Sequence, residues 1–245
     1  MKWRACTKAW ISKSISDSFR LREEAWAKRA GQKGPGKKGC AGKMADIKFA
    51  KQIVFINCSV PLVMLAWDGA HRNLGANPLE FVTHVTGTLT LVFLLISLLV
   101  TPARKILGMP WLIKLRRMCG LFAFFYGCLH LITYVWFDRF FDLKSTVKDI
   151  GDRPFIAVGI ASLLLLLPLA ITSTNKMVKR LGGKRWNRLH KLVYLAGIGG
   201  VIHYRLLVKA DARLPIAFGV ALGLMLGYRI VTSMLARLSR PEPAR

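Results

Sequence analysis

The stretch FVTHVTGTLTLVFLLISLLV, residues 81–100, contains no Asp, Glu, Lys or Arg. A helix of this length spans the hydrocarbon core of a bilayer, which is roughly 30 Å thick. Similar apolar blocks recur along the 245-residue chain, which is 53% hydrophobic. A soluble domain would show apolar residues at regular spacing, interrupted by charged faces. The sequence therefore predicts an all-α membrane protein built as one helical bundle.

We expect six transmembrane helices in this bundle. The first is short and is interrupted by Asn57 and Pro61, and Pro168 is expected to kink the fourth. The expected spans are residues 53–67, 81–100, 117–137, 154–172, 188–208 and 214–232.

The connections between these spans alternate in charge. Lys and Arg are in excess before the first span, after the second, after the fourth and in the C-terminal tail, whereas residues 68–80, 138–153 and 209–213 are nearly balanced. Basic connections stay on the cytoplasmic side of a membrane. The pattern predicts an N-in, C-in topology. It also accounts for the net charge of +26 without a nucleic-acid partner, because the charges separate apolar blocks and do not line one face.

Residues 1–43 stand apart as a basic, glycine-containing segment. We expect a disordered extension, or sequence upstream of a natural start at Met44; an arm that binds anionic membrane lipid is the alternative. The transmembrane domain is expected at 44–235 and a basic cytosolic tail at 236–245. The five cysteines form no CxxC motif, so neither a disulfide framework nor a zinc site is indicated.

Four of the five histidines fall inside the expected spans: His84, His130, His190 and His203. By the span limits given above, no Asp or Glu lies in spans two to six. A single buried histidine is usually a satisfied polar residue. Four without carboxylate partners favour a bound cofactor, and haem iron accepts axial imidazole ligands.

The depth of each histidine follows from the helical rise of about 1.5 Å per residue. His84, His130 and His203 are expected near the outer side of the membrane, and His190 near the inner side. Two histidines at one depth on facing helices hold a haem between them. The estimate therefore pairs His203 with His130 or with His84.

His190 has no histidine at its own depth on another span. Met118 and Cys119 lie near that level, but neither is favoured as an axial ligand. His190 is predicted to bind a second haem with an unusual partner, or to border a different cofactor. In one continuous helix His190 and His203 would point about 140° apart, so the helix bends at the glycines between them or the two face different sides.

Longer motifs resemble the MsrQ family (formerly YedZ), the haem-binding membrane subunits of bacterial periplasmic protein-methionine-sulfoxide reductases. The family lies within the ferric-reductase-like transmembrane group. The resemblance covers about residues 45–232. It rests on LEFVTHVTG (79–87), RRMCGLFAFFYGCLHLITY (116–134), TSTNKMVKRLGGKRWNRLHKLVY (172–194) and VIHYR (201–205).

The resemblance implies a multi-pass protein of the bacterial inner membrane with one or two b-type haems and an associated FMN. Its electrons would come from the quinone pool or a cytosolic flavin reductase. They would pass to a periplasmic molybdopterin catalytic subunit of the MsrP type, which carries out the sulfoxide chemistry in protein repair. His84, His130, His190 and His203 are the implied haem-site residues.

Two other functions remain open at this point. One is a ferric or quinone reductase-type transmembrane cytochrome b. The other is a histidine-lined proton or metal transporter, although such pathways usually include carboxylates within the membrane. The basic stretch KRLGGKRWNRLHK (179–191) either sets topology or docks a flavin or an acidic reductase surface, and its Trp186 is expected at the membrane interface.

Overall fold

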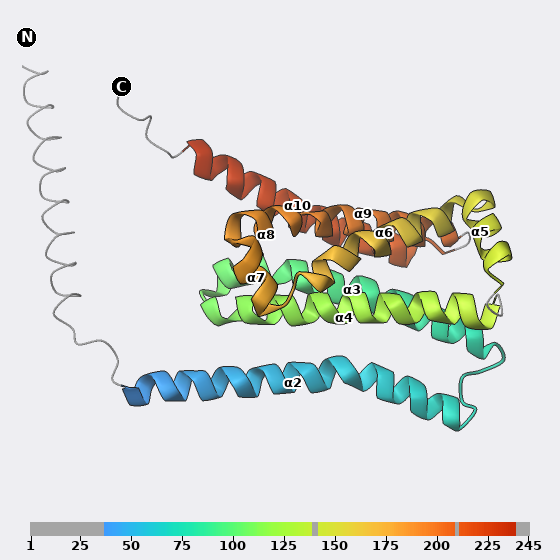
Figure 1. Cartoon of the computed structure of the whole chain (residues 1–245), viewed down its shortest axis with the longest axis horizontal. Coiled ribbons are helices and arrows are strands. Elements are labelled where there is room, and N and C mark those ends of the chain that lie inside the picture. The colour runs from blue at the N-terminus through green and yellow to red at the C-terminus, as the bar shows by residue number, and fades with distance from the viewer. Residues whose placement is uncertain (1–36, 139–141, 209–210, 239–245) are drawn as a thin grey trace, which may run out of the picture. The chain divides into compact units, whose positions relative to one another are not determined.

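The computed structural model is helical throughout its regular structure and describes residues 37–138, 142–208 and 211–238 (Figure 1). Residues 1–36 of the expected extension and 239–245 of the expected tail lie outside this part. The elements are α2 (Lys37–Ala70), α3 (Pro78–Leu107), η1 (Pro110–Leu112), α4 (Ile113–Thr133), η2 (Tyr134–Asp138), α5 (Leu143–Asp152), α6 (Pro154–Ile171), α7 (Asn175–Leu181), α8 (Gly183–Leu189), α9 (Leu192–Leu207) and α10 (Arg213–Leu238).

Five helices in the described part are long and apolar enough to cross a membrane. The chain is therefore a multi-pass membrane protein. The segments are Lys48–Ala70, Pro78–Leu107, Pro110–Trp136, Pro154–Ile171 and Arg213–Leu235. The fifth expected span corresponds to α9, which has only 16 residues. It begins at Leu192 and not near residue 188, because the chain turns at His190 and Lys191.

Helix α2 continues through the two residues that were expected to interrupt it. Pro61 lies inside the helix, where its missing N–H removes one backbone hydrogen bond. The side chain of Asn57 donates to the carbonyl oxygen of Ile53 at 2.8 Å, so its amide is satisfied within the helix. The short first span predicted at 53–67 is therefore part of a longer helix.

Helix α3 extends beyond the predicted span at both ends. Asn77 caps its N-terminus by accepting from the backbone N–H of Glu80, and Pro78 occupies the first turn, where no N–H is needed. Arg104 and Lys105 in the last turn favour helix because they face the negative end of its dipole. Gly108 ends the helix with φ = 66°, a conformation open to glycine.

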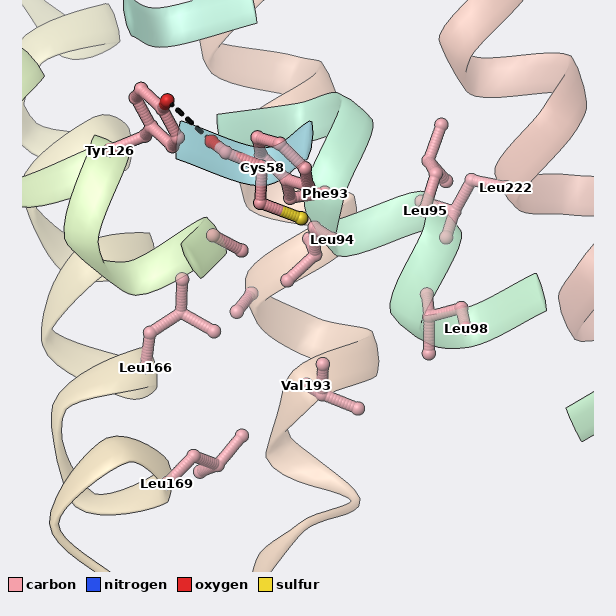
Figure 2. Close-up of a cluster of buried hydrophobic side chains, with 12 residues drawn as sticks. Cys58, Phe93, Leu94, Leu95, Leu98, Tyr126, Leu166, Leu169, Val193 and Leu222 are labelled. Carbon is pink, nitrogen blue, oxygen red and sulfur yellow. Dashed lines mark hydrogen bonds between the residues drawn. The ribbon is translucent and has the colours of Figure 1, made fainter. Parts of the chain in front are cut away.

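The helices from α3 to α10 pack in neighbouring pairs, with α3 along α4 and α6 along α9, while α10 contacts both α9 and α3 (Figure 1). The basic connections lie at one end of the bundle. At this end α3 ends, α4 begins, and α7 and α8 lie. We call this the basic end and the other the opposite end. A cluster of buried side chains fills the space between the pairs (Figure 2); it includes Leu94, Leu166 and Val193.

Tyr126 of α4 is fully buried and donates its hydroxyl hydrogen to the carbonyl oxygen of Cys58 at 2.8 Å (Figure 2). We expect Tyr126→Phe to lower the free energy of unfolding by about 0.5–1.5 kcal/mol, because the carbonyl loses a donor in an apolar setting. Denaturation in a graded detergent mixture measures this loss. The matched control is Tyr228→Phe on α10; equal stability of both variants would contradict the prediction.

Candidate cofactor site

A cavity of about 210 Å³ lies between α3, α4, α6 and α9, toward the opposite end. It is many times larger than the space a single water needs. Its lining is mostly apolar but includes three of the four predicted histidines: His84 from α3, His130 from α4 and His203 from α9. The helix pairs described above therefore bring together histidines up to 119 positions apart in the sequence.

The imidazole rings of His130 and His203 lie next to each other in this cavity, nearly perpendicular. Their centroids are 6.0 Å apart and their planes are inclined by 82°. Two axial imidazoles on one metal ion, each bonded at about 2 Å, have ring centres about 6 Å apart. The spacing of this pair therefore suits one metal ion between the rings.

Each of the two rings is held by a backbone carbonyl. His130 Nδ1 lies 2.9 Å from the carbonyl oxygen of Thr83, and His203 Nδ1 lies 2.6 Å from that of Phe155. A carbonyl oxygen can only accept, so Nδ1 carries the proton in both rings and Nε2 keeps its lone pair. Metal-bound histidines almost always have this second bond, which fixes the tautomer and the ring orientation.

Two glycines make room for these rings. A Cβ atom on Gly87 would lie 3.0 Å from His130 Cε1, and one on Gly159 would lie 2.7 Å from His203 Nδ1. Each imidazole thus packs directly on the backbone of the neighbouring helix. Gly127 and Gly200 also line the cavity. Walls without side chains suit a flat macrocycle, so the residues present fit a haem, which His130 and His203 would hold.

His84 differs from the other two histidines of the cavity. Its side chain is 47% exposed, and its Nε2 lies 3.9 Å from Glu80 Oε1. The prediction that the buried histidines have no carboxylate partner is therefore wrong for His84, because α3 begins at Pro78 and places Glu80 one turn before it. Of the two pairings predicted for His203, the geometry favours His130.

His190 lines a second cavity, also of about 210 Å³, at the basic end. It lies in the turn before α9, so the predicted angle of 140° along one helix does not apply. Its ring stacks on Trp186 at a centroid distance of 3.8 Å, and its Nδ1 lies 3.1 Å from the Trp186 carbonyl oxygen. Trp186 in turn donates its indole N–H to the carbonyl oxygen of Thr172 at 3.0 Å. Trp186 was expected only to lie at the membrane interface. In the structure it also orients His190.

The second cavity is positively charged. Arg116 and Arg117 line it together with His190. Arg117 is anchored to the start of α7, where it donates to the side chain of Asn175 at 2.8 Å and to the carbonyl oxygen of Ser173. Partial burial lowers the pKa of His190, and the charges of the two arginines lower it further. A neutral imidazole beside two guanidinium groups can accept a proton or bind a metal while the arginines bind an anion.

Only two residues, Leu94 and Leu166, line both cavities. Both are buried members of the central cluster in Figure 2. The two cavities are therefore neighbours with an apolar partition between them. Neither Met118 nor Cys119, the residues considered near His190, belongs to the lining of the second cavity.

The glycines of α9 serve two purposes. Gly197 and Gly199 allow close helix packing, since a Cβ on Gly197 would meet Leu94 and Leu222 and one on Gly199 would meet the hydroxyl of Ser162. Gly200 lines the first cavity. Sequence reasoning missed Gly87 and Gly159 as site residues; the signal available was a glycine within an apolar helical block, and it does not reveal which ring the glycine faces.

This fold, with two imidazoles meeting between its helices, defines a helical membrane protein with a site for a metal-centred cofactor. Residues 86–201 match the family model described as "Ferric reductase like transmembrane component". His130 and His190 lie within the matched region, and His84 and His203 lie two residues outside its ends.

Curated relatives narrow the class further, and the chain belongs to the family whose members carry the name "Protein-methionine-sulfoxide reductase heme-binding subunit MsrQ". The chain is 50% identical to the Herminiimonas arsenicoxydans member over 187 residues, which are 76% of this chain and 86% of the relative. It is 51% identical to the Rhodospirillum rubrum member over 194 residues, 78% of this chain and 92% of the relative. A Caulobacter vibrioides member is 48% identical over 178 residues, which are 73% of this chain and 85% of the relative.

Proposed function

We propose that this chain is a haem-binding membrane subunit that carries electrons to a protein-methionine-sulfoxide reductase. The observation that supports the proposal most directly is the pair of neighbouring imidazoles in the first cavity, whose ring centroids are 6.0 Å apart. His130 and His203 would hold the haem iron in this proposal. His84 lies at the exposed edge of the same cavity and is not a ligand.

Haem bound between these two histidines would supply one-electron redox chemistry. The residues of the chain prepare the site for that chemistry. The carbonyl groups of Thr83 and Phe155 keep the proton on Nδ1 of each imidazole, so that Nε2 points away from the backbone with a free lone pair. The apolar lining, which includes Leu91 and Leu163, excludes water and so contributes to setting the reduction potential.

The second cavity is proposed as the entry point for electrons. Its arginines suit the phosphate of FMN or the propionates of a second haem, because guanidinium groups bind such oxyanions in pairs of hydrogen bonds. His190 would then be an axial ligand of that second haem or a proton-exchanging neighbour of the flavin. A quinol or a cytosolic flavin reductase would be the donor at this end.

The proposed topology has six spans with both termini in the cytoplasm of a bacterium, in the inner membrane. The span that must be added to the five long apolar helices is α9, which has 16 residues and at about 1.5 Å per residue is about 24 Å long. Its position between α6, α10 and α3 supports this assignment, since protein and not lipid covers much of its surface. The basic end then faces the cytoplasm, and the first cavity lies toward the periplasm, where a molybdopterin catalytic subunit of the MsrP type would accept electrons.

The optical spectrum of the detergent-purified protein, oxidised and then reduced with dithionite, tests the proposal. We expect a Soret band and a sharp reduced α-band typical of two imidazole ligands. One haem per chain would assign haem to the first cavity alone, and two would add the second cavity. A colourless protein from haem-replete cells would refute the electron-transfer proposal.

A further inference from the structure

The two arginines that line the second cavity have different surroundings. The guanidinium group of Arg117 donates to the side chain of Asn175 and to the carbonyl oxygen of Ser173. Arg116 is also only partly exposed and lines the same cavity, but among the described residues its guanidinium group has neither a hydrogen-bond acceptor nor a carboxylate. Partial burial of an unpaired charge costs free energy. Arg116 is therefore the arginine with donors to offer to a ligand.

Helix α3 contributes a buried hydroxyl to the same lining. Ser97 is 5% exposed and lines the second cavity, and among the described residues its hydroxyl forms no hydrogen bond. Thr86 and Ser162 instead donate to the carbonyl oxygen four residues earlier, both at 2.7 Å, as hydroxyls within apolar helices usually do. The fully enclosed side-chain atoms without a partner in the described part are Thr101 Oγ1 and Arg229 Nε. The Ser97 oxygen is not one of them, so a ligand in the cavity can reach it.

Ser97 and Arg116 border the same part of the cavity. Helix α3 packs along α4, and a Cβ atom on Gly120 of α4 would lie 3.7 Å from the Ser97 oxygen. Gly120 follows Arg116 by four residues, so the two lie on one face of α4, and all three residues line the cavity. The free hydroxyl and the free guanidinium group are therefore about one helical turn apart along the wall.

The charge around Arg116 indicates that a ligand there is negative. Arg229 lies close enough to Arg116 for the two positive charges to repel each other, and Arg117 adds a third. The described carboxylates beyond residue 50 lie in connections or helix ends at the opposite end: Asp68, Glu80, Asp138, Asp142, Asp149, Asp152 and Asp211. Within that part of the chain, no carboxylate at the basic end balances the arginines, whereas an oxyanion on a ligand would.

We propose that Arg116 and Ser97 form the oxyanion-binding part of the second cavity, and that Arg117 contributes charge while it holds the start of α7. The inference rests on the proposed function, in which this cavity holds FMN or a second haem, and it names the residues that select for such a cofactor. Both cofactors share one chemistry, a planar redox ring with an attached oxyanion, which is a phosphate in FMN and a propionate in haem. The guanidinium group donates two hydrogen bonds to the oxyanion and the hydroxyl donates a third.

Equilibrium binding of paired analogues to the detergent-purified full chain, with haem already in the first cavity, tests this assignment. FMN is compared with riboflavin, which lacks the phosphate, and haem with its dimethyl ester, which lacks the free carboxylates. Flavin fluorescence measures the first pair, and the increase of the Soret band above the haem already bound measures the second. We expect the cofactor of the second cavity to bind at least about tenfold more tightly than its analogue, because hydrogen bonds between charged groups are the strong ones.

Four variants locate the preference on the proposed residues. Arg116→Gln should reduce it to less than about twofold, and Ser97→Ala should reduce it severalfold. The matched control is Lys114→Gln, which removes an exposed charge two residues before Arg116 but does not line the cavity, and it should keep the full preference. Gly120→Ala is a steric test. Its Cβ meets only the Ser97 oxygen, at an ordinary contact distance, so the fold should tolerate it while a ligand beside Arg116 binds severalfold more weakly.

Three outcomes would overturn the proposal. Both cofactors could fail to bind or bind no better than their analogues. Arg116→Gln could keep the preference as fully as Lys114→Gln does. Phosphatidylglycerol could displace both cofactors with the same dependence on Arg116, which would assign the oxyanion site to a lipid headgroup. Ser97→Ala and Gly120→Ala keep every charge, so they remain informative if Arg116→Gln fails to fold. Absence of haem from the first cavity of the unaltered chain would instead refute the proposed function.

Discussion

Replacing His203 by alanine is expected to remove the haem from the first cavity while the protein remains inserted and helical. The loss should exceed about 100-fold in haem affinity, because even a residue that only supports a metal-bound histidine is worth 10–100-fold. The ring of His203 is one of two that meet in this cavity, 6.0 Å from that of His130. Haem content per chain and the reduced α-band measure the effect, and circular dichroism checks the helices.

The matched control for this prediction is His84→Ala in the same cavity. His84 is partly exposed and lies near Glu80, so its removal should leave the haem content and the α-band nearly unchanged. Loss of haem in His84→Ala, with retention in His203→Ala, would show that the axial pair is His130 with His84. That result would contradict the pairing proposed above.

Gly159→Ala is expected to reduce haem affinity by roughly 10- to 100-fold, although it adds only one methyl group and removes no ligand. The new Cβ would lie 2.7 Å from His203 Nδ1, closer than non-bonded atoms approach. The imidazole must therefore move away from α6, which breaks its hydrogen bond to the Phe155 carbonyl oxygen. Haem retention during dilution and the midpoint potential measure the change.

Gly223→Ala on α10 provides the comparison for this variant, because a Cβ there meets nothing within 4 Å. Alanine favours helix over glycine, so this control should be as stable as the original chain or slightly more stable. If Gly159→Ala binds haem as tightly as Gly223→Ala does, His203 is not held against α6 in the way the geometry indicates.

The arrangement of the two cavities is what makes the family assignment physically reasonable. The first contains the imidazole pair and lies toward the opposite end; the second contains His190 with two arginines and lies at the basic end. Leu94 and Leu166 are the shared wall between them. Electron carriers placed in the two cavities would have these two leucines between them.

Much of the fold was predictable from sequence because a bilayer imposes simple length and polarity requirements on a helix. Blocks such as residues 81–100 and 154–172 had to be helices long enough to span hydrocarbon, and α3 and α6 occupy them. Helix ends were harder to place. Glu80 and Arg104 belong to α3 although they are charged, since capping and dipole interactions extend a helix beyond its apolar part.

Sequence alone also identified the histidines as the unusual residues, because an imidazole in a membrane helix requires a partner. It left the partners open, because the ring that His203 meets depends on how α4 and α9 are rotated and packed. His203 meets His130, which lies 73 residues earlier in the sequence. Only the tertiary structure turned Gly159 toward His203 and placed Trp186 against His190. Apolar length and charge determine which segments cross the membrane, whereas side-chain packing between helices determines which residues meet.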